Sequence, residues 1–175
     1  MSILARRMWR AARLESELYE EVEADRSATA QSAGVVLLSA LGAGIGSIAN
    51  GGVEGIVGCT IAAFAGWYAW AVAAAFIGTR WLPEPETSSD TGELLRTLGY
   101  STAPGVLRIF ALIDPIAGWV FLFCTGWMLV AMVIAVRQAL DYRSTLRAVS
   151  VCAIGFPIYA ISILFSLLWV GPWPI

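Results

Sequence analysis

The chain has 175 residues, of which 58% are hydrophobic and 14% charged, and its mean hydropathy is +0.73, whereas a soluble domain carries about 25% charged residues. This composition excludes a soluble enzyme and predicts an integral membrane protein. The net charge is −2, all eleven cationic residues are arginines and there is no histidine, so the usual metal ligand and the commonest general base are missing.

Residues 1–30 are polar and charged, so no cleavable secretory signal is expected at this end. Apolar side chains recur there at steps of three or four, which places them on one face of an amphipathic helix: Leu4, Met8, Ala11, Leu14, Leu18 and Val22. Four arginines come first along this helix and six acidic residues follow. The segment is predicted either to lie on the membrane surface or to pack, solvated, on the ends of the spans.

The first two membrane spans are predicted at residues 32–49 and 55–78, and a tight turn at residues 50–52 joins them. Both spans carry small residues at a spacing that lets another helix approach closely. We therefore expect helix packing at four positions: Gly42, Gly46, Ala62 and Gly66.

A linker with two prolines follows at residues 83–90, and Gly99 is expected to stop a short helix after it. The third span is predicted at residues 100–113 and is short for a crossing. The fourth and fifth spans are predicted at residues 116–136 and 148–170, with Pro157 as a kink, and residues 171–175 form a tail.

The arginines decide whether the short segment crosses the membrane. If it does, ten of the eleven arginines lie on one side, within the N-terminal segment, residues 79–100 and residues 137–147. The positive-inside rule then predicts an all-α, polytopic bundle of five transmembrane helices in the inner (cytoplasmic) membrane. The N-terminus is expected in the cytoplasm, and the C-terminus in the periplasm or outside the cell.

The eleventh arginine, Arg108, falls within the third span. A charge there is either a functional group or a side chain that snorkels back to the cytoplasmic interface. Asp114 lies six residues further on and about 240° around the helix, so no direct pair with Arg108 is expected. Tyr100 and Pro104, which open the span, complete the set of candidate functional residues.

The sequence contains no catalytic motif, and we expect no enzymatic activity, no cofactor, no metal site and no nucleic-acid partner. Each of the three cysteines lies inside an apolar block without a C-x-x-C pair, so buried free thiols are expected at Cys59, Cys124 and Cys152.

Three stretches of the chain carry a resemblance to a known family: E-L-Y-E-E at Glu17–Glu21, Q-S-A-G-V-V-L-L-S at residues 31–39, and L-G-Y-S-T-A-P at Leu98–Pro104. With five spans and the N-terminus inside, the chain resembles the Yip1 family of integral membrane proteins over about residues 15–170. Eukaryotic members carry Asp-Leu-Tyr-Gly-Pro before the first span, whereas Glu20 and Glu21 follow Leu18 and Tyr19 here. The chain is therefore similar to the bacterial branch, and the small-GTPase binding that the eukaryotic motif implies is not expected.

Two hypotheses for the function remain open. The first is a non-enzymatic integral membrane protein that organises partners or lipids through helix–helix contacts, by itself, as a homo-oligomer or as an accessory subunit of a larger membrane complex. Its expected partners are membrane lipids and other integral membrane proteins. The second is a small transporter or channel that uses Arg108 and the short third span.

Overall fold

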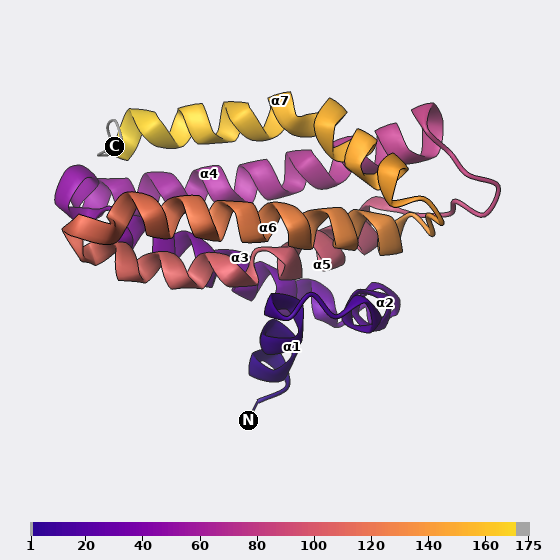
Figure 1. Cartoon of the computed structure of the whole chain (residues 1–175), viewed down its shortest axis with the longest axis horizontal. Coiled ribbons are helices and arrows are strands. Elements are labelled where there is room, and N and C mark those ends of the chain that lie inside the picture. The colour runs from indigo at the N-terminus through magenta and orange to yellow at the C-terminus, as the bar shows by residue number, and fades with distance from the viewer. Residues whose placement is uncertain (1, 171–175) are drawn as a thin grey trace.

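The computed structural model describes the backbone of residues 2–170, and their side chains except at positions 50, 158, 159, 162, 163 and 165–170. All regular elements among these residues are helical, which confirms the predicted all-α bundle. Four long helices run side by side along the longest axis of the molecule (Figure 1). They are α3 (Ala28–Gly46), α4 (Ile48–Phe76), α6 (Ala117–Ala139) and α7 (Thr145–Val170).

Within the described part of the chain, three helical stretches are long and apolar enough to cross a membrane: Ala28–Gly46, Gly51–Trp81 and Asp114–Ala139. This number is lower than the predicted five. The last predicted span lies within α7, of which Thr145–Pro157 is a shorter apolar helix. The predicted tail at residues 171–175 lies outside the described residues.

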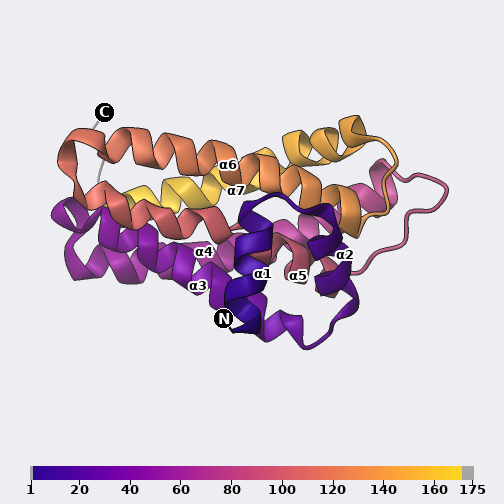
Figure 2. The same cartoon turned by 60° about the horizontal axis from the view of Figure 1, so that its bottom comes forward.

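The single amphipathic helix predicted at the N-terminus is wrong, because the chain forms two helices, α1 (Ile3–Ala12) and α2 (Ser16–Ala24). Between them Leu14 has a φ of 61°, which a continuous right-handed helix cannot contain. Figure 2 shows α1 crossing the bundle and α2 beside α5. The predicted apolar stripe is nevertheless buried at Ala11, Leu18 and Val22.

Ion pairs between α1 and α2 explain why the helix breaks. The Arg7 guanidinium lies 2.9 Å from carboxylate oxygens of both Glu21 and Asp25, and Arg10 pairs with Glu15 and Glu21. In one continuous helix Arg7 would lie about four turns away from Glu21 and about five from Asp25. A hairpin brings these opposite charges together and still keeps the apolar stripe on one side.

The predicted turn at residues 50–52 lies within a longer reversal of the chain, which begins at Ser47 and ends at the non-helical Gly52. α3 ends at Gly46, and the chain turns at Ser47, whose hydroxyl donates to the carbonyl oxygen of Ala43 at 2.9 Å. Residues 50 and 51 belong to α4, and Gly52 interrupts its helical geometry with a φ of 56°. Glycine adopts this φ without the steric penalty that a side chain would add.

The segment predicted as the third span differs most from its prediction, because the chain does not form one short α-helix over residues 100–113. It forms α5 (Thr91–Ser101), a 3₁₀ helix η2 (Ala103–Leu112) and a short turn η3 (Asp114–Ile116). The carboxylates of Asp90 and Glu93 cap the start of α5 reciprocally, each accepting the other's backbone N–H at 2.9 Å. Gly99 does not stop the helix, which continues to Ser101. Its lack of a side chain instead lets α5 pack closely on Ser32 of α3.

The predicted third span covers only the last part of α5 together with η2. An α-helix rises about 1.5 Å per residue and a 3₁₀ helix about 2.0 Å, so α5 and η2 together extend over about 36 Å. That length exceeds the roughly 30 Å of hydrocarbon in a bilayer.

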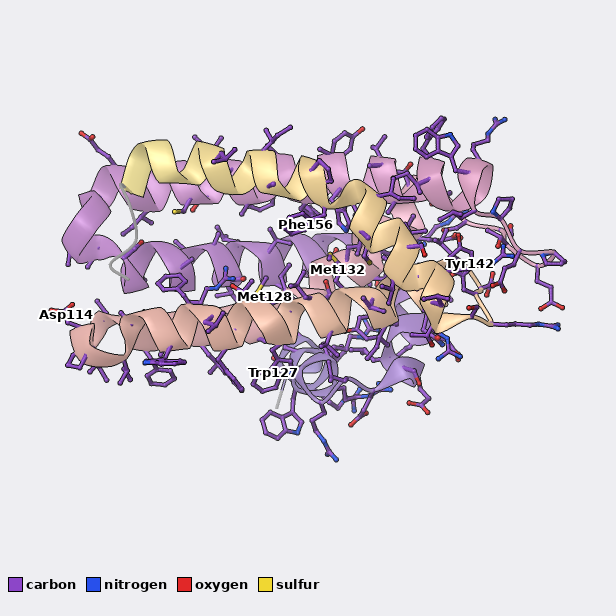
Figure 3. The ribbon with its side chains drawn as sticks, turned by 45° about the horizontal axis from the view of Figure 1, so that its top comes forward. Asp114, Trp127, Met128, Met132, Tyr142 and Phe156 are labelled. Atoms are coloured by element: carbon purple, nitrogen blue, oxygen red, sulfur yellow. The ribbon has the colours of Figure 1, made fainter. Side chains whose placement is uncertain are left out.

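The connections that carry charge meet at one end of the bundle. There the backbone N–H of Arg143 donates to the Glu84 carboxylate at 2.9 Å, and the Tyr142 hydroxyl donates to the carbonyl oxygens of Gly78 and Leu82 at 3.0 and 2.8 Å. Asp114 lies at the opposite end (Figure 3). The ends of the bundle thus differ in their polar contacts.

Candidate functional site

A cavity of about 360 Å³ lies between α3, α4, α5 and α6. Its wall on α4 runs from Cys59 to Trp70 and its wall on α6 from Phe121 to Met132, so each wall covers eleven residue steps, or about 16 Å. Most of the lining side chains are apolar. Ala62 and Gly66, for which we expected helix packing, lie on the α4 wall.

Two glycines of α3 position η2 at one end of this cavity. A Cβ atom on Gly42 would lie 2.8 Å from the carbonyl oxygen of Val106, and one on Gly46 would lie 2.1 Å from that of Arg108. The backbones of α3 and η2 therefore approach each other so closely that only glycine fits. From the η2 side, Gly105 lies against Ser39 and Met128 in the same way.

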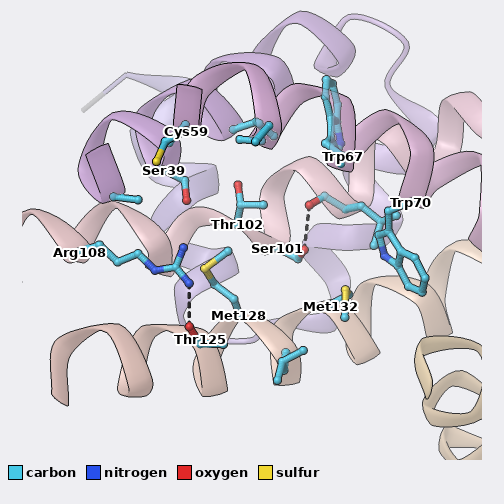
Figure 4. Close-up of a pocket in the computed structure, with 18 of the residues that line it drawn as sticks. Ser39, Cys59, Trp67, Trp70, Ser101, Thr102, Arg108, Thr125, Met128 and Met132 are labelled. Carbon is cyan, nitrogen blue, oxygen red and sulfur yellow. Dashed lines mark hydrogen bonds between the residues drawn. The ribbon is translucent and has the colours of Figure 1, made fainter. Parts of the chain in front are cut away.

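The 3₁₀ winding determines which side chains of η2 share a face. With three residues per turn, Gly105, Arg108 and Ala111 align, whereas in an α-helix each three-residue step would drift by about 60°. Gly105 and Ala111 are buried against α3. Arg108 extends from the same η2 segment into the cavity, and Figure 4 shows its guanidinium beside Thr125 and Met128.

The Arg108 side chain contacts neutral groups there. One Nη donates to the Thr125 hydroxyl at 2.8 Å, and the guanidinium carbon lies 5.6 Å from the centroid of the Phe121 ring, within range of a cation–π contact. The Nε–H is buried and has no hydrogen-bond partner among the described residues.

The snorkelling expectation for Arg108 stays a prediction, because it depends on where the bilayer lies. In the structure the Arg108 side chain points to α6 and reaches Thr125, near the middle of that helix.

The other candidate residues lie elsewhere. Tyr100 is buried, and its hydroxyl donates to the side-chain oxygen of Gln31 at 2.9 Å. The same oxygen also accepts a hydrogen bond from Arg7 at 3.1 Å. Pro104 is buried in the first turn of η2, and Asp114 is exposed at the end of the bundle. Of the four candidate functional residues, all of which are described, only Arg108 lines the cavity.

Two cavity residues were missed as functional candidates. Thr125, which accepts the hydrogen bond from Arg108, is the sole hydroxyl in the predicted span 116–136, and that isolation was a usable signal. Trp70 is the second. Its indole N–H is buried without a hydrogen-bond partner among the described residues, whereas that of Trp67 donates to the carbonyl oxygen of Leu95 at 3.0 Å.

The cavity thus combines a cation and unused N–H donors with apolar walls. Within the described part of the chain, no cluster of three or more His, Cys, Asp or Glu could hold a metal ion. The three cysteines are buried and free, as predicted. No protein-family model, curated protein or solved structure matches this chain. The resemblance to the Yip1 family is therefore neither supported nor refuted by comparison.

A second polar cluster lies where α2 meets α5 and α6. Burial raises the pKa of the Glu23 carboxyl from 4.5 to about 7, and the neighbouring carboxylates of Asp141, Glu93 and Glu20 add to this rise, against the opposing charge of Arg96. The folded state therefore holds the Glu23 proton more tightly than the unfolded state does. Stability must then fall as the pH rises from about 4.5 through 7.

We expect Glu23→Gln to flatten this pH dependence, because the amide stays neutral at every pH. The variant should match the parent protein at pH 5 and exceed its thermal stability at pH 8, measured as Tm in an uncharged detergent. Glu17→Gln, at an exposed position of the same helix, should leave the pH profile unchanged. An unaltered slope between pH 5 and 7 in the Glu23 variant would contradict this assignment.

Proposed function

We propose that the protein is a non-enzymatic integral membrane protein that organises membrane partners or lipids through helix contacts. One observation carries this proposal: large apolar side chains are exposed along the sides of the bundle, while the ion pairs lie in the N-terminal hairpin and at one end. The exposed side chains include Val57, Ile61, Tyr68 and Phe76 of α4, Trp119, Leu122 and Phe123 of α6, and Leu146 and Ile154 of α7. Such a surface needs lipid or another protein against it.

In this proposal five segments cross the bilayer in turn: α3, α4, α5 with η2, α6 and α7. The three long apolar helices support insertion, and the roughly 36 Å of α5 with η2 is enough for a fourth crossing. The arginine-bearing connections then face the cytoplasm, which places the protein in the cytoplasmic membrane with its C-terminus outside. We propose that it shares this layout with the bacterial branch of the Yip1 family.

A topology reporter tests the five crossings. A reporter inserted at Ser88, in the exposed connection between α4 and α5, should read as cytoplasmic, and one fused after Ile175 should read as periplasmic or extracellular. A cytoplasmic reading at both positions would contradict an odd number of crossings.

Purification in a mild detergent tests the organising role. We expect the protein to elute in an assembly larger than one chain, either with another integral membrane protein, as an accessory subunit would, or as a homo-oligomer. Native mass spectrometry distinguishes these two forms. A monomer that retains neither protein nor lipid would contradict the proposal.

A small transporter or channel is the second proposal, and the inward-facing Arg108 is the observation that favours it. Purified protein in liposomes would then show solute flux. Arg108→Lys should fold normally but lose that flux if a bidentate anion contact is needed, because Lys supplies only a point charge.

A further inference from the structure

We propose that the cavity binds one anionic amphiphile taken from the membrane. Its carboxylate or phosphate head would lie at Arg108, and its acyl chain would follow the cavity toward Trp67 and Trp70. This inference deepens the proposed function by naming the ligand class, and it rests on the membrane insertion proposed above.

The charge of Arg108 has no counterion in the cavity among the described residues, and a bound anion would supply one. Its guanidinium contacts Thr125 and Phe121, which are neutral, and no ion pair joins it to an acid among the described residues. A charge held in an apolar interior without a counterion is energetically unfavourable. An anionic head group removes this penalty.

The unused donors of Arg108 select the chemistry of that head group. A guanidinium carries five N–H donors in a planar fork. One nitrogen is occupied by Thr125, and the Nε–H has no acceptor. Carboxylate and phosphate oxygens accept two parallel hydrogen bonds from such a fork, and these charge-assisted bonds are stronger than neutral ones.

The shape of the cavity selects an acyl chain. The apolar walls of α4 and α6 continue for about 16 Å from the level of Phe121 to Trp70 and Met132, which is long enough for an extended chain. Met128 and Met132 line this part, and methionine adapts readily to flexible ligands. An inorganic anion would leave this space empty.

The position of the opening identifies the bilayer as the source of the ligand. Leu122 lines the cavity and is 65% exposed on the apolar side of α6. The cavity therefore reaches the surface among side chains that face lipid in the proposed arrangement, so a ligand would enter laterally from the membrane.

Matched ligands test the proposal on the purified full chain in an uncharged detergent. Oleate and methyl oleate have the same chain and differ in charge, 1-oleoyl lysophosphatidic acid carries a phosphate head on the same single chain, and inorganic phosphate lacks the chain. We expect oleate or lysophosphatidic acid to raise Tm and bind at least tenfold more tightly than methyl oleate. The tighter of the two identifies the head group.

Two ligand outcomes would overturn the proposal. Equal binding of oleate and methyl oleate would show that the charge of Arg108 has no role. Inorganic phosphate that binds, or that displaces oleate, would show a site for a free anion and no site for a lipid.

Variants then locate the site. Arg108→Gln should weaken oleate binding on the order of 10- to 100-fold, while Arg80→Gln, an exposed arginine outside the cavity, should bind as the parent does. Ala62→Leu narrows the cavity without removing Arg108, so it should abolish stabilisation by oleate. This second variant keeps the test decisive if Arg108→Gln folds poorly. A folded Ala62 variant with unchanged oleate affinity would place binding elsewhere. Failure of the protein to insert into vesicles would instead count against the proposed function.

Discussion

Gly46→Ala is expected to destabilise the folded protein by about 3 kcal/mol, the upper part of the usual range for overpacking. Even the single added methyl group would lie 2.1 Å from the carbonyl oxygen of Arg108 and 3.2 Å from the Cβ of Ala111. The first of these contacts involves backbone, which cannot rotate away, so η2 would have to move off α3. Thermal or denaturant unfolding in detergent measures the loss.

Gly34→Ala is the matched control, because Gly34 lies in the same helix and an added Cβ there meets nothing within 4 Å. In an open position alanine favours the helix over glycine by about 1 kcal/mol, so this variant should be more stable than the parent. If both substitutions had the same effect, the close contact between α3 and η2 would not exist.

Arg96→Met is expected to cost about 2–4 kcal/mol, because it removes charged hydrogen bonds and leaves carbonyl groups unpaired. Arg96 is only 7% exposed, and its Nε donates to the carbonyl oxygens of Val22 at 3.1 Å and Glu23 at 2.9 Å. These bonds join α5 to the end of α2. Methionine keeps the length of the side chain but supplies no donor, so the N-terminal hairpin should detach, which limited proteolysis would detect together with a lower Tm.

Arg26→Met serves as the control for lost charge, since Arg26 is exposed close to the same junction. Its effect should stay within about 0.5 kcal/mol, as for other exposed positions. Arg96→Lys should recover only part of the stability, because an ammonium group cannot reproduce the planar fork of the guanidinium. Resistance of the Arg96→Met hairpin to protease would show that other contacts hold α2 in place.

Hydropathy was sufficient to locate the long helices. The predicted spans 32–49, 55–78 and 116–136 overlap α3, α4 and α6 along most of their lengths, because an uninterrupted apolar stretch of that length can satisfy its backbone only as a helix. Their ends were less predictable. Ser47 acts through a hydrogen bond to its own helix and Gly99 through a tertiary contact with Ser32, and composition reveals neither.

The third crossing and the N-terminal hairpin depend on contacts between distant residues. The polar α5 packs on the bundle because Arg96 donates hydrogen bonds to carbonyl oxygens at the end of α2, more than seventy residues earlier in the chain. The sorting of arginines before acids was visible in the sequence, but both interpretations offered for it, a membrane-surface helix and a solvated helix on the ends of the spans, assumed one continuous helix. The same order of charges also favours a hairpin, since Arg7 and Glu21 can form their ion pair only if the chain reverses between them.

Part of the cavity was within reach of sequence reasoning. A lone arginine in an apolar segment drew attention to Arg108, which lines the cavity, and a lone hydroxyl in the next predicted span could have identified Thr125 as its neighbour. Their contact follows from the 3₁₀ winding of η2, which the hydropathy pattern does not specify. Trp70 carried no comparable signal, because tryptophan is common in apolar segments.

The uneven placement of ion pairs makes the two ends of the molecule respond differently to ionic strength. All the ion pairs among the described residues lie within the N-terminal hairpin or between residues 84–86 and 143–147. Salt shortens the screening length to about 10 Å at 0.1 M and weakens exposed pairs most. Added salt therefore loosens the hairpin and the two loops first, while the contact between α3 and η2, which is steric, is unaffected.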